Sequence, residues 1–112
     1  MDIQTLAARQ LSAYNTSDLD AFVACYHPEV RVFDDLELSF EGRDAFRARY
    51  APMFEHGDFG GEVPQRVVMG IHCVDLEHWW RRDPETGERR HGSLLVRYTE
   101  RDGLIGTVQF LR

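Results

Sequence analysis

The fold is decided by residues 15–34, which read Asn-Thr-Ser-Asp-Leu-Asp-Ala-Phe-Val-Ala-Cys-Tyr-His-Pro-Glu-Val-Arg-Val-Phe-Asp. Asp18 can cap a helix, because its carboxylate can accept hydrogen bonds from backbone N–H groups two and three residues further on. Pro28 disfavours helical geometry at the residue before it and is expected to end that helix. From Val30 the residues alternate at strand period, so Asp34 shares a face with the strand's valines. The stretch therefore predicts a helix that turns into a strand ending in a carboxylate.

Two more helices are expected on either side of this stretch. Residues 3–14 carry apolar side chains at helical spacing, with Gln10 beside them. A turn at residues 41–44 precedes a third helix, which is expected to end at the turn-forming residues 56–61. The helix that Asp18 begins is expected to bury a stripe of four residues, Leu19, Phe22, Val23 and Tyr26.

The second half of the chain is rich in predicted strands, at residues 62–69, 71–81, 91–100 and 104–111. Arg101-Asp102-Gly103 is a tight hairpin signal between the last two. Helices followed by a meander predict an α+β fold: a cone-shaped, curved antiparallel sheet of four or five strands, with three N-terminal helices packed on its concave face. The length of 112 residues predicts one domain spanning residues 1–112.

Composition limits the partners and the compartment. The formal net charge of −6 repels phosphate backbones, so we expect no nucleic-acid partner. Cys25 and Cys73 are too few for a disulfide framework and fit buried thiols in the cytosol. No apolar run reaches the roughly 18 residues that span a bilayer, and the first residues lack the features of a secretion signal. We therefore expect a cytoplasmic protein with no membrane partner.

The predicted strands are apolar on both parities in places, which three helices cannot cover. A second subunit over the outer face of the sheet is the simplest remedy, so the pattern predicts a homodimer. On the inner face, a strongly curved sheet leaves an opening between itself and the helices. An opening of this kind can hold one small apolar molecule.

Four short motifs occur in order along nearly the whole chain: Asn15-x-x-Asp18-Leu19-Asp20-x-Phe22, Tyr26-x-Pro28-x-Val30-x-Val32-x-Asp34, Gly42-Arg43-Asp44-Ala45-Phe46-Arg47-x-x-Tyr50, and a final hairpin over residues 98–112. Together they resemble the nuclear-transport-factor-2-like superfamily, specifically its SnoaL-like branch of polyketide cyclases, ketosteroid isomerases and small uncharacterised proteins. The resemblance implies a fold, but not one activity, because this fold carries many different functions.

The resemblance implies a catalytic role for Asp34. Ketosteroid isomerases of the family use an aspartate base at the end of the first strand, and Asp34 falls at that position. Their two oxyanion donors are a tyrosine and a protonated aspartate; Gln10 takes the place of the tyrosine, and the place of the aspartate falls near Leu95. Because both donors are missing, the resemblance does not imply steroid isomerisation. Tyr14 and Tyr50 are the alternative phenolic donors.

The residues alone leave two interpretations of Asp34. A carboxyl group buried on an apolar strand face has a raised pKa unless it is paired, which suits a general base near neutral pH. Alternatively, Asp34 caps the turn that follows the strand or binds an arginine. Tyr14 and Tyr50 have the same ambiguity, because a phenol at a core-facing helical position often only fills space. Tyr26 is interpreted as a core residue.

The strand at residues 71–81 carries further polar candidates. His72 and His78 are six residues apart, which at about 3.3 Å per residue is too far to bind one metal ion. Glu77 is either an arginine partner or a second pocket carboxylate, and we favour the arginine partner. Trp79-Trp80 either flanks the dimer interface or lies over the pocket mouth, and we favour the interface.

The sequence leads to two functional hypotheses. The first is an enzyme, such as an isomerase, cyclase or dehydratase, that needs no cofactor and no metal and acts on a small, largely apolar carbonyl compound, with Asp34 as base and Tyr14 or Tyr50 holding the enolate. The second is a ligand-binding or structural homodimer without chemistry. The expected pocket residues are Gln10, Val32, Phe54, His72, Glu77, Leu95 and Phe110.

Overall fold

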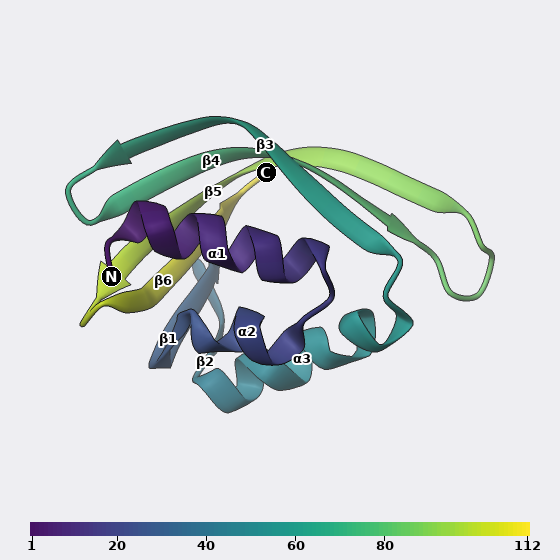
Figure 1. Cartoon of the computed structure of the whole chain (residues 1–112), viewed down its shortest axis with the longest axis horizontal. Helices are drawn as coiled ribbons and strands as arrows, with labels where there is room; N and C mark the ends of the chain where they lie inside the picture. The colour runs from purple at the N-terminus through teal and green to yellow at the C-terminus, as the bar shows by residue number, and fades with distance from the viewer.

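A computed structural model describes all of residues 1–112 (Figure 1). It contains three helices and six strands in one chain. The helices are α1 (Ile3–Asn15), α2 (Leu19–Ala24) and α3 (Arg43–His56). The strands are β1 (Tyr26–Asp34), β2 (Glu37–Glu41), β3 (Phe59–Met69), β4 (His72–Arg82), β5 (Arg89–Arg101) and β6 (Leu104–Leu111).

All six strands form one curved sheet in the order β2-β1-β6-β5-β4-β3. The three helices lie on the same side of it, as Figure 1 shows, so the predicted α+β fold is confirmed. Two details differ from the prediction. The sheet has six strands, and it is mixed because β1 runs parallel to β6 while every other neighbouring pair is antiparallel.

The junction between α2 and β1 follows the prediction at its start and departs from it at its end. The Asp18 carboxylate accepts a hydrogen bond from the Ala21 N–H at 3.1 Å and so caps α2. The helix ends at Ala24, however, and Tyr26 is the first residue of β1. The Ile105 N–H donates to the Cys25 carbonyl at 2.9 Å, so pairing with β6 begins before Pro28 is reached. Tertiary pairing therefore ends the helix earlier than the local proline signal predicts.

Asn15 ties the end of α1 to β3. Its side-chain Nδ2 donates to the Gly61 carbonyl at 2.9 Å, and its Oδ1 accepts from the Gly61 N–H at 2.8 Å. The amide thus pairs with a backbone across 46 residues of sequence, as a neighbouring strand would. This fixes α1 against the sheet where the inner face of β4 carries Glu77 close to Gly61.

The turns largely follow their sequence signals. Asp102 and Gly103 have φ values of 52° and 78°, as the type I′ turn of a two-residue hairpin requires. Gly57, with φ of 68°, ends α3 in the left-handed conformation. The strand that the sequence did not predict is β2, whose Leu38 is 42% exposed. It is an edge strand with no buried residue, and so it lacks the buried alternation that marks a strand.

The core lies between the inner face of the sheet and the helices. Phe22 is at its centre, with ring centroids of Tyr26, Tyr50 and Phe54 at 5.1 to 5.2 Å from its own. Such tilted and edge-on contacts add to the hydrophobic stabilisation of the core. None of the three helices is both long and apolar enough to span a bilayer.

One buried ion pair joins the neighbouring strands β3 and β4. The Arg66 guanidinium donates from Nε to Asp75 Oδ1 at 2.7 Å and from Nη2 to Oδ2 at 2.9 Å. The Asp75 side chain is 1% exposed and that of Arg66 20%. Cys73 donates its thiol hydrogen to Asp75 Oδ1 at 3.4 Å. A buried carboxylate is therefore neutralised by a two-point contact from the next strand.

Candidate functional site

A cavity of about 490 Å³ opens between the inner face of the sheet and the helices. This volume lies within the range of pockets that hold small organic molecules. Aromatic and aliphatic side chains make up most of its wall. The residues that line it are Gln10, Tyr14, Phe22, Tyr26, Val32, Phe33, Asp34, Ser39, Phe40, Phe46, Arg49, Tyr50, Pro52, Met53, Glu77, Trp79, Arg81, Leu94, Tyr98, Val108, Phe110 and Arg112.

The structure brings together seven of the ten residues that the sequence proposed for the site. These are Gln10, Tyr14, Val32, Asp34, Tyr50, Glu77 and Phe110. The sequence also placed Trp79 at the dimer interface, but its side chain lines this cavity. Trp79 packs tightly over Gly92, where an added Cβ would lie 2.7 Å from its ring.

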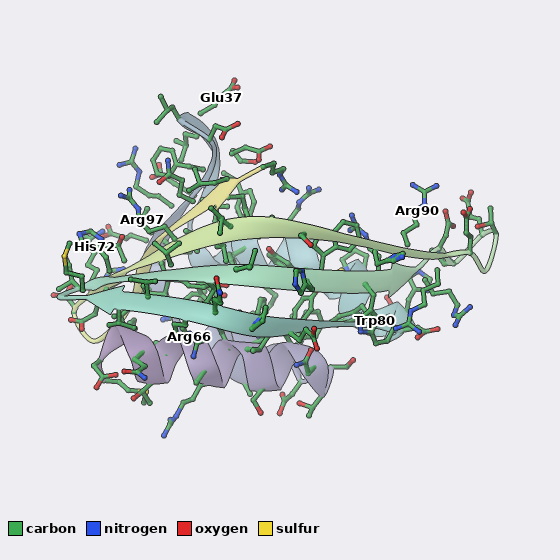
Figure 2. All side chains as sticks on the ribbon, turned by 90° about the horizontal axis from the view of Figure 1, so that it is seen from above. Glu37, Arg66, His72, Trp80, Arg90 and Arg97 are labelled. Atoms are coloured by element: carbon green, nitrogen blue, oxygen red, sulfur yellow. The ribbon has the colours of Figure 1, made fainter.

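The other three proposed residues do not line the cavity. Phe54 is buried in the core, with its ring centroid 5.9 Å from that of Tyr14. His72 lies at the opposite end of the sheet from Arg90 (Figure 2), and its Nδ1 is 3.1 Å from Thr99 Oγ1. Leu95 is 42% exposed, on the other side of β5. Alternate side chains of β5 face the cavity, and Leu94 is one of them, whereas its neighbour Leu95 faces away.

Asp34 lies at the rim of the cavity. Its side chain is 58% exposed, and Oδ1 accepts a hydrogen bond from Arg112 Nε at 3.0 Å. Asp34 therefore lacks the burial that its expected role as general base requires. The structure contains the alternative, in which Asp34 binds an arginine. A β-bulge between Val32 and Phe33 interrupts the pairing with β2 just before Asp34.

Glu77 is the carboxyl group that faces the interior of the cavity. It projects from the inner face of β4, is partly buried and lies in the wall. No arginine lies within ion-pair distance of it, contrary to the partner that the sequence favoured. Loss of solvation, and then the nearby negative charge of Asp75, raise the pKa of Glu77 to about 7. Gly61 leaves it room, since a Cβ there would lie 3.3 Å from Glu77 Oε1.

All four tyrosines of the chain line the same cavity. The Tyr26 hydroxyl donates to Gln10 Oε1 at 3.2 Å, while the hydroxyls of Tyr14, Tyr50 and Tyr98 have no protein partner. Arg97 Nε is the only fully buried side-chain polar atom that lacks a hydrogen bond. The three tyrosine hydroxyls are therefore not fully buried, and they are open to the cavity. Burial, and then the charge of Glu77, raise the pKa of Tyr50 to about 12. The phenols are therefore neutral donors at physiological pH.

The family model for the SnoaL-like domain matches residues 7–107. The chain belongs to the SnoaL-like domain family. This assignment confirms the family resemblance that the sequence motifs indicated. No curated protein sequence matches this chain significantly.

Solved structures share the fold of this SnoaL-like domain at low sequence identity. An uncharacterised cystatin-fold protein from Novosphingobium aromaticivorans has a TM-score of 0.89 at 20% identity, with 100% of this chain and 99% of the other covered. A proposed SnoaL-like polyketide cyclase from Jannaschia sp. CCS1 has 0.81 at 17%, covering 96% and 83%. TerC, co-crystallised with polyporic acid, has 0.81 at 13%, covering 96% and 88%. At these identities the likeness establishes the fold alone.

The structure also adds site residues that sequence reasoning missed. Tyr98 lies on the inner face of β5, and Arg49, Arg81 and Arg112 lie around the opening of the SnoaL-like domain's cavity. Strand parity could have indicated Tyr98, because it alternates with Val96. No local signal indicates the arginines, since they come from α3, β4 and the residue after β6 and converge only in the fold.

The raised pKa of Glu77 has a consequence for stability. Because its folded pKa of about 7 lies above the ordinary value for a glutamate side chain, its ionisation opposes folding. The native state keeps its full stability below pH 4.5 and loses part of it as the pH rises through 7. We expect Glu77→Gln to be more stable than the wild type by about 2–3 kcal/mol at pH 8, and about equally stable at pH 4.5. Urea denaturation at the two pH values measures this difference; equal stability at both contradicts it.

Proposed function

We propose that this SnoaL-like domain binds a small, largely apolar carbonyl compound and transfers a proton at the carbon next to its carbonyl group, without a cofactor. The observation that carries the proposal is the Glu77 carboxyl, which faces the cavity with no cationic partner and has a pKa of about 7. A base with a pKa near the working pH combines a useful ionised fraction with useful basicity.

The proposed reaction uses two kinds of group in the cavity. Ionised Glu77 removes the proton from the α-carbon, and the electron pair of that C–H bond forms an enolate. A phenol, Tyr14 or Tyr50, donates a hydrogen bond to the enolate oxygen as charge develops there. Return of the proton from Glu77 to another carbon completes an isomerisation. Alternatively, the enolate carbon attacks a second carbonyl of the same molecule, and protonated Glu77 returns its proton to the alkoxide that forms, which completes a cyclisation.

The proposal assigns the base to Glu77 instead of Asp34. Both residues reach the cavity, but Asp34 is ion-paired with Arg112 in contact with solvent. Its Oδ1 is therefore already occupied by a guanidinium N–H. Glu77 lies among the four phenols and the apolar wall, where water is displaced by a bound ligand and the interactions with a developing charge strengthen.

The related structures support a small-molecule ligand. They include a proposed polyketide cyclase, and TerC was co-crystallised with polyporic acid. The second hypothesis, a protein that binds a ligand without reacting with it, is favoured by one observation. Gln10, which stands where the family's isomerases have a phenolic donor, is engaged with the Tyr26 hydroxyl and with the Ala7 carbonyl at 3.1 Å.

Proton exchange separates the two hypotheses without knowledge of the natural substrate. Acetophenone, 1-tetralone and 2-indanone would each be incubated with the protein in deuterium oxide, and loss of the α-proton signal followed by NMR. We expect the wild type to accelerate exchange for at least one of them, since abstraction is the first proposed step. Chemical-shift changes at Tyr50 and Trp79 without faster exchange support a binding protein and contradict the enzyme.

We also infer a homodimer through the outer face of the sheet. No helix covers β3, β4 and β5 on this face, which Figure 2 views from above. Apolar side chains occupy neighbouring positions across it, and Val67 is 68% exposed and Leu95 42%. The central group is Val67, Val74, Leu76, Leu95 and Leu111.

Sedimentation equilibrium tests the homodimer. We expect the wild type to have the mass of two chains and the Leu95→Arg variant the mass of one. A monomeric wild type contradicts the inference.

A further inference from the structure

The rim of the cavity differs in charge from the rest of the molecule. The chain has a net charge of −6, yet three arginines, Arg49, Arg81 and Arg112, line the opening together with a single rim carboxylate, Asp34. Six of the other ten arginines form salt bridges, whereas no carboxylate lies within 4 Å of the guanidinium of Arg49 or Arg81. Two arginines without an ion-pair partner therefore lie at the entrance of the cavity of an acidic protein.

Two of these guanidiniums rest on aromatic rings that belong to the cavity wall. Arg81 Cζ lies 4.9 Å from the centroid of the Trp79 ring, and Arg112 Cζ lies 5.2 Å from that of Phe110. Stacking of this kind holds a long side chain in place at low cost in solvation. It also leaves the N–H groups at the guanidinium edges available, because the face of the group is what contacts the ring.

The rim charges also act on the interior. Arg49, Arg112 and Arg81 each lower the pKa of the Tyr50 phenol, against the larger effect of its burial. Their guanidiniums therefore lie close enough to the cavity to interact with a group inside it. An anion placed at the rim would be attracted by all three arginines. The negative charge of Glu77 lies elsewhere in the cavity, among the tyrosines that line the interior.

We infer that the ligand of this cavity carries a carboxylate, which binds at the rim between Arg49, Arg81 and the free N–H groups of Arg112, while its apolar carbonyl-bearing body lies inside. The inference rests on the proposed function for the location of the ligand and specifies its chemical class. A planar carboxylate fits because guanidinium N–H groups can bind its two oxygens in parallel. The substrate class is then an aromatic or alicyclic keto acid.

A matched pair of probes tests this inference. 4-Acetylbenzoate and 4-methylacetophenone share a ring and an acetyl group, and differ in whether the opposite end is a carboxylate or a methyl group. Isothermal titration would measure the affinity of each for the full-length protein. We expect the wild type to bind the acid at least about tenfold more tightly, which corresponds to about 1.4 kcal/mol, and this preference to shrink as salt is added.

Variants locate the source of the preference. In the double variant Arg49→Gln/Arg81→Gln we expect the ratio of the two affinities to fall to near one. Arg9→Gln is the matched control, because Arg9 is an exposed arginine of α1 that does not line the cavity. Circular dichroism checks that each variant is folded.

The outcomes separate this inference from the proposed function. Equal affinity for the two probes, or a preference that survives in the double variant, overturns the keto-acid inference even if α-proton exchange is observed. A preference that depends on the arginines without any α-proton exchange supports the keto-acid inference and contradicts the proposed catalysis. Loss of the preference in Arg9→Gln would assign it to the overall charge of the protein and overturn the rim site.

Discussion

Replacing Glu77 with glutamine is expected to lower the rate of α-proton exchange by about 10²–10⁴-fold, the contribution typical of a positioned general base. The substitution keeps the shape of the side chain and removes its ability to accept a proton. In the wild type the rate is expected to rise with pH through about 7, because only ionised Glu77 can act as the base. In Glu77→Gln that step in the pH–rate profile should vanish.

Two carboxylate variants make this prediction specific. Glu62→Gln is the matched control, because Glu62 is an exposed carboxylate on β3 that lies outside this cavity. Its rate and pH profile should equal those of the wild type. Asp34→Asn tests the base that the family resemblance implies. Should Asp34→Asn abolish exchange while Glu77→Gln retains it, Asp34 is the base and the role proposed for Glu77 is wrong.

Replacing Arg66 with leucine is expected to destabilise the fold by about 3–5 kcal/mol, as removal of one member of a buried ion pair does. The variant leaves the Asp75 carboxylate, which is 1% exposed, without its two-point partner. Denaturation by urea measures the change in the free energy of unfolding.

A double variant distinguishes the ion pair from simple loss of packing. In Arg66→Leu/Asp75→Leu neither charge remains, and most of the lost stability is expected to return because no unpaired buried charge is left. Arg47→Leu is the surface control: its pair with Asp20 is exposed, and its removal is expected to cost less than about 1 kcal/mol. A double variant no more stable than Arg66→Leu would show that the arginine stem, and not the charge, provides the stabilisation.

The parts of the fold that could be predicted from sequence are those set by local chemistry. Asp18 caps α2 because its carboxylate reaches its own helix, and Asp102-Gly103 makes a turn because both positions tolerate positive φ. Helical spacing likewise located α1 and α3. The misplaced end of α2 has a different origin, since Tyr26 joins β1 through pairing with Ile105, a residue far away in the sequence.

The site was predicted less well, because cavities form between elements that the sequence does not bring together. Glu77 and Asp34 are both acidic residues on strands near apolar neighbours, and nothing local distinguishes them. Their environments differ because Arg112 reaches Asp34 and no arginine reaches Glu77. Leu95 was expected in the pocket because the place of the family's aspartate falls near it, but an offset of a single residue reverses strand parity, and Leu94 is the residue that faces inward.

The most direct test of the account is a titration of the Glu77 carboxyl in the folded, unliganded protein. Carbon-13 NMR of glutamate-labelled protein would follow its δ-carbon shift against pH, with Glu77→Gln identifying the signal. We expect a midpoint near 7, set by burial and by the charge of Asp75. A midpoint near the ordinary value for glutamate, about 4.3, would mean that the group is solvated or paired, and would contradict the assignment of Glu77 as the base.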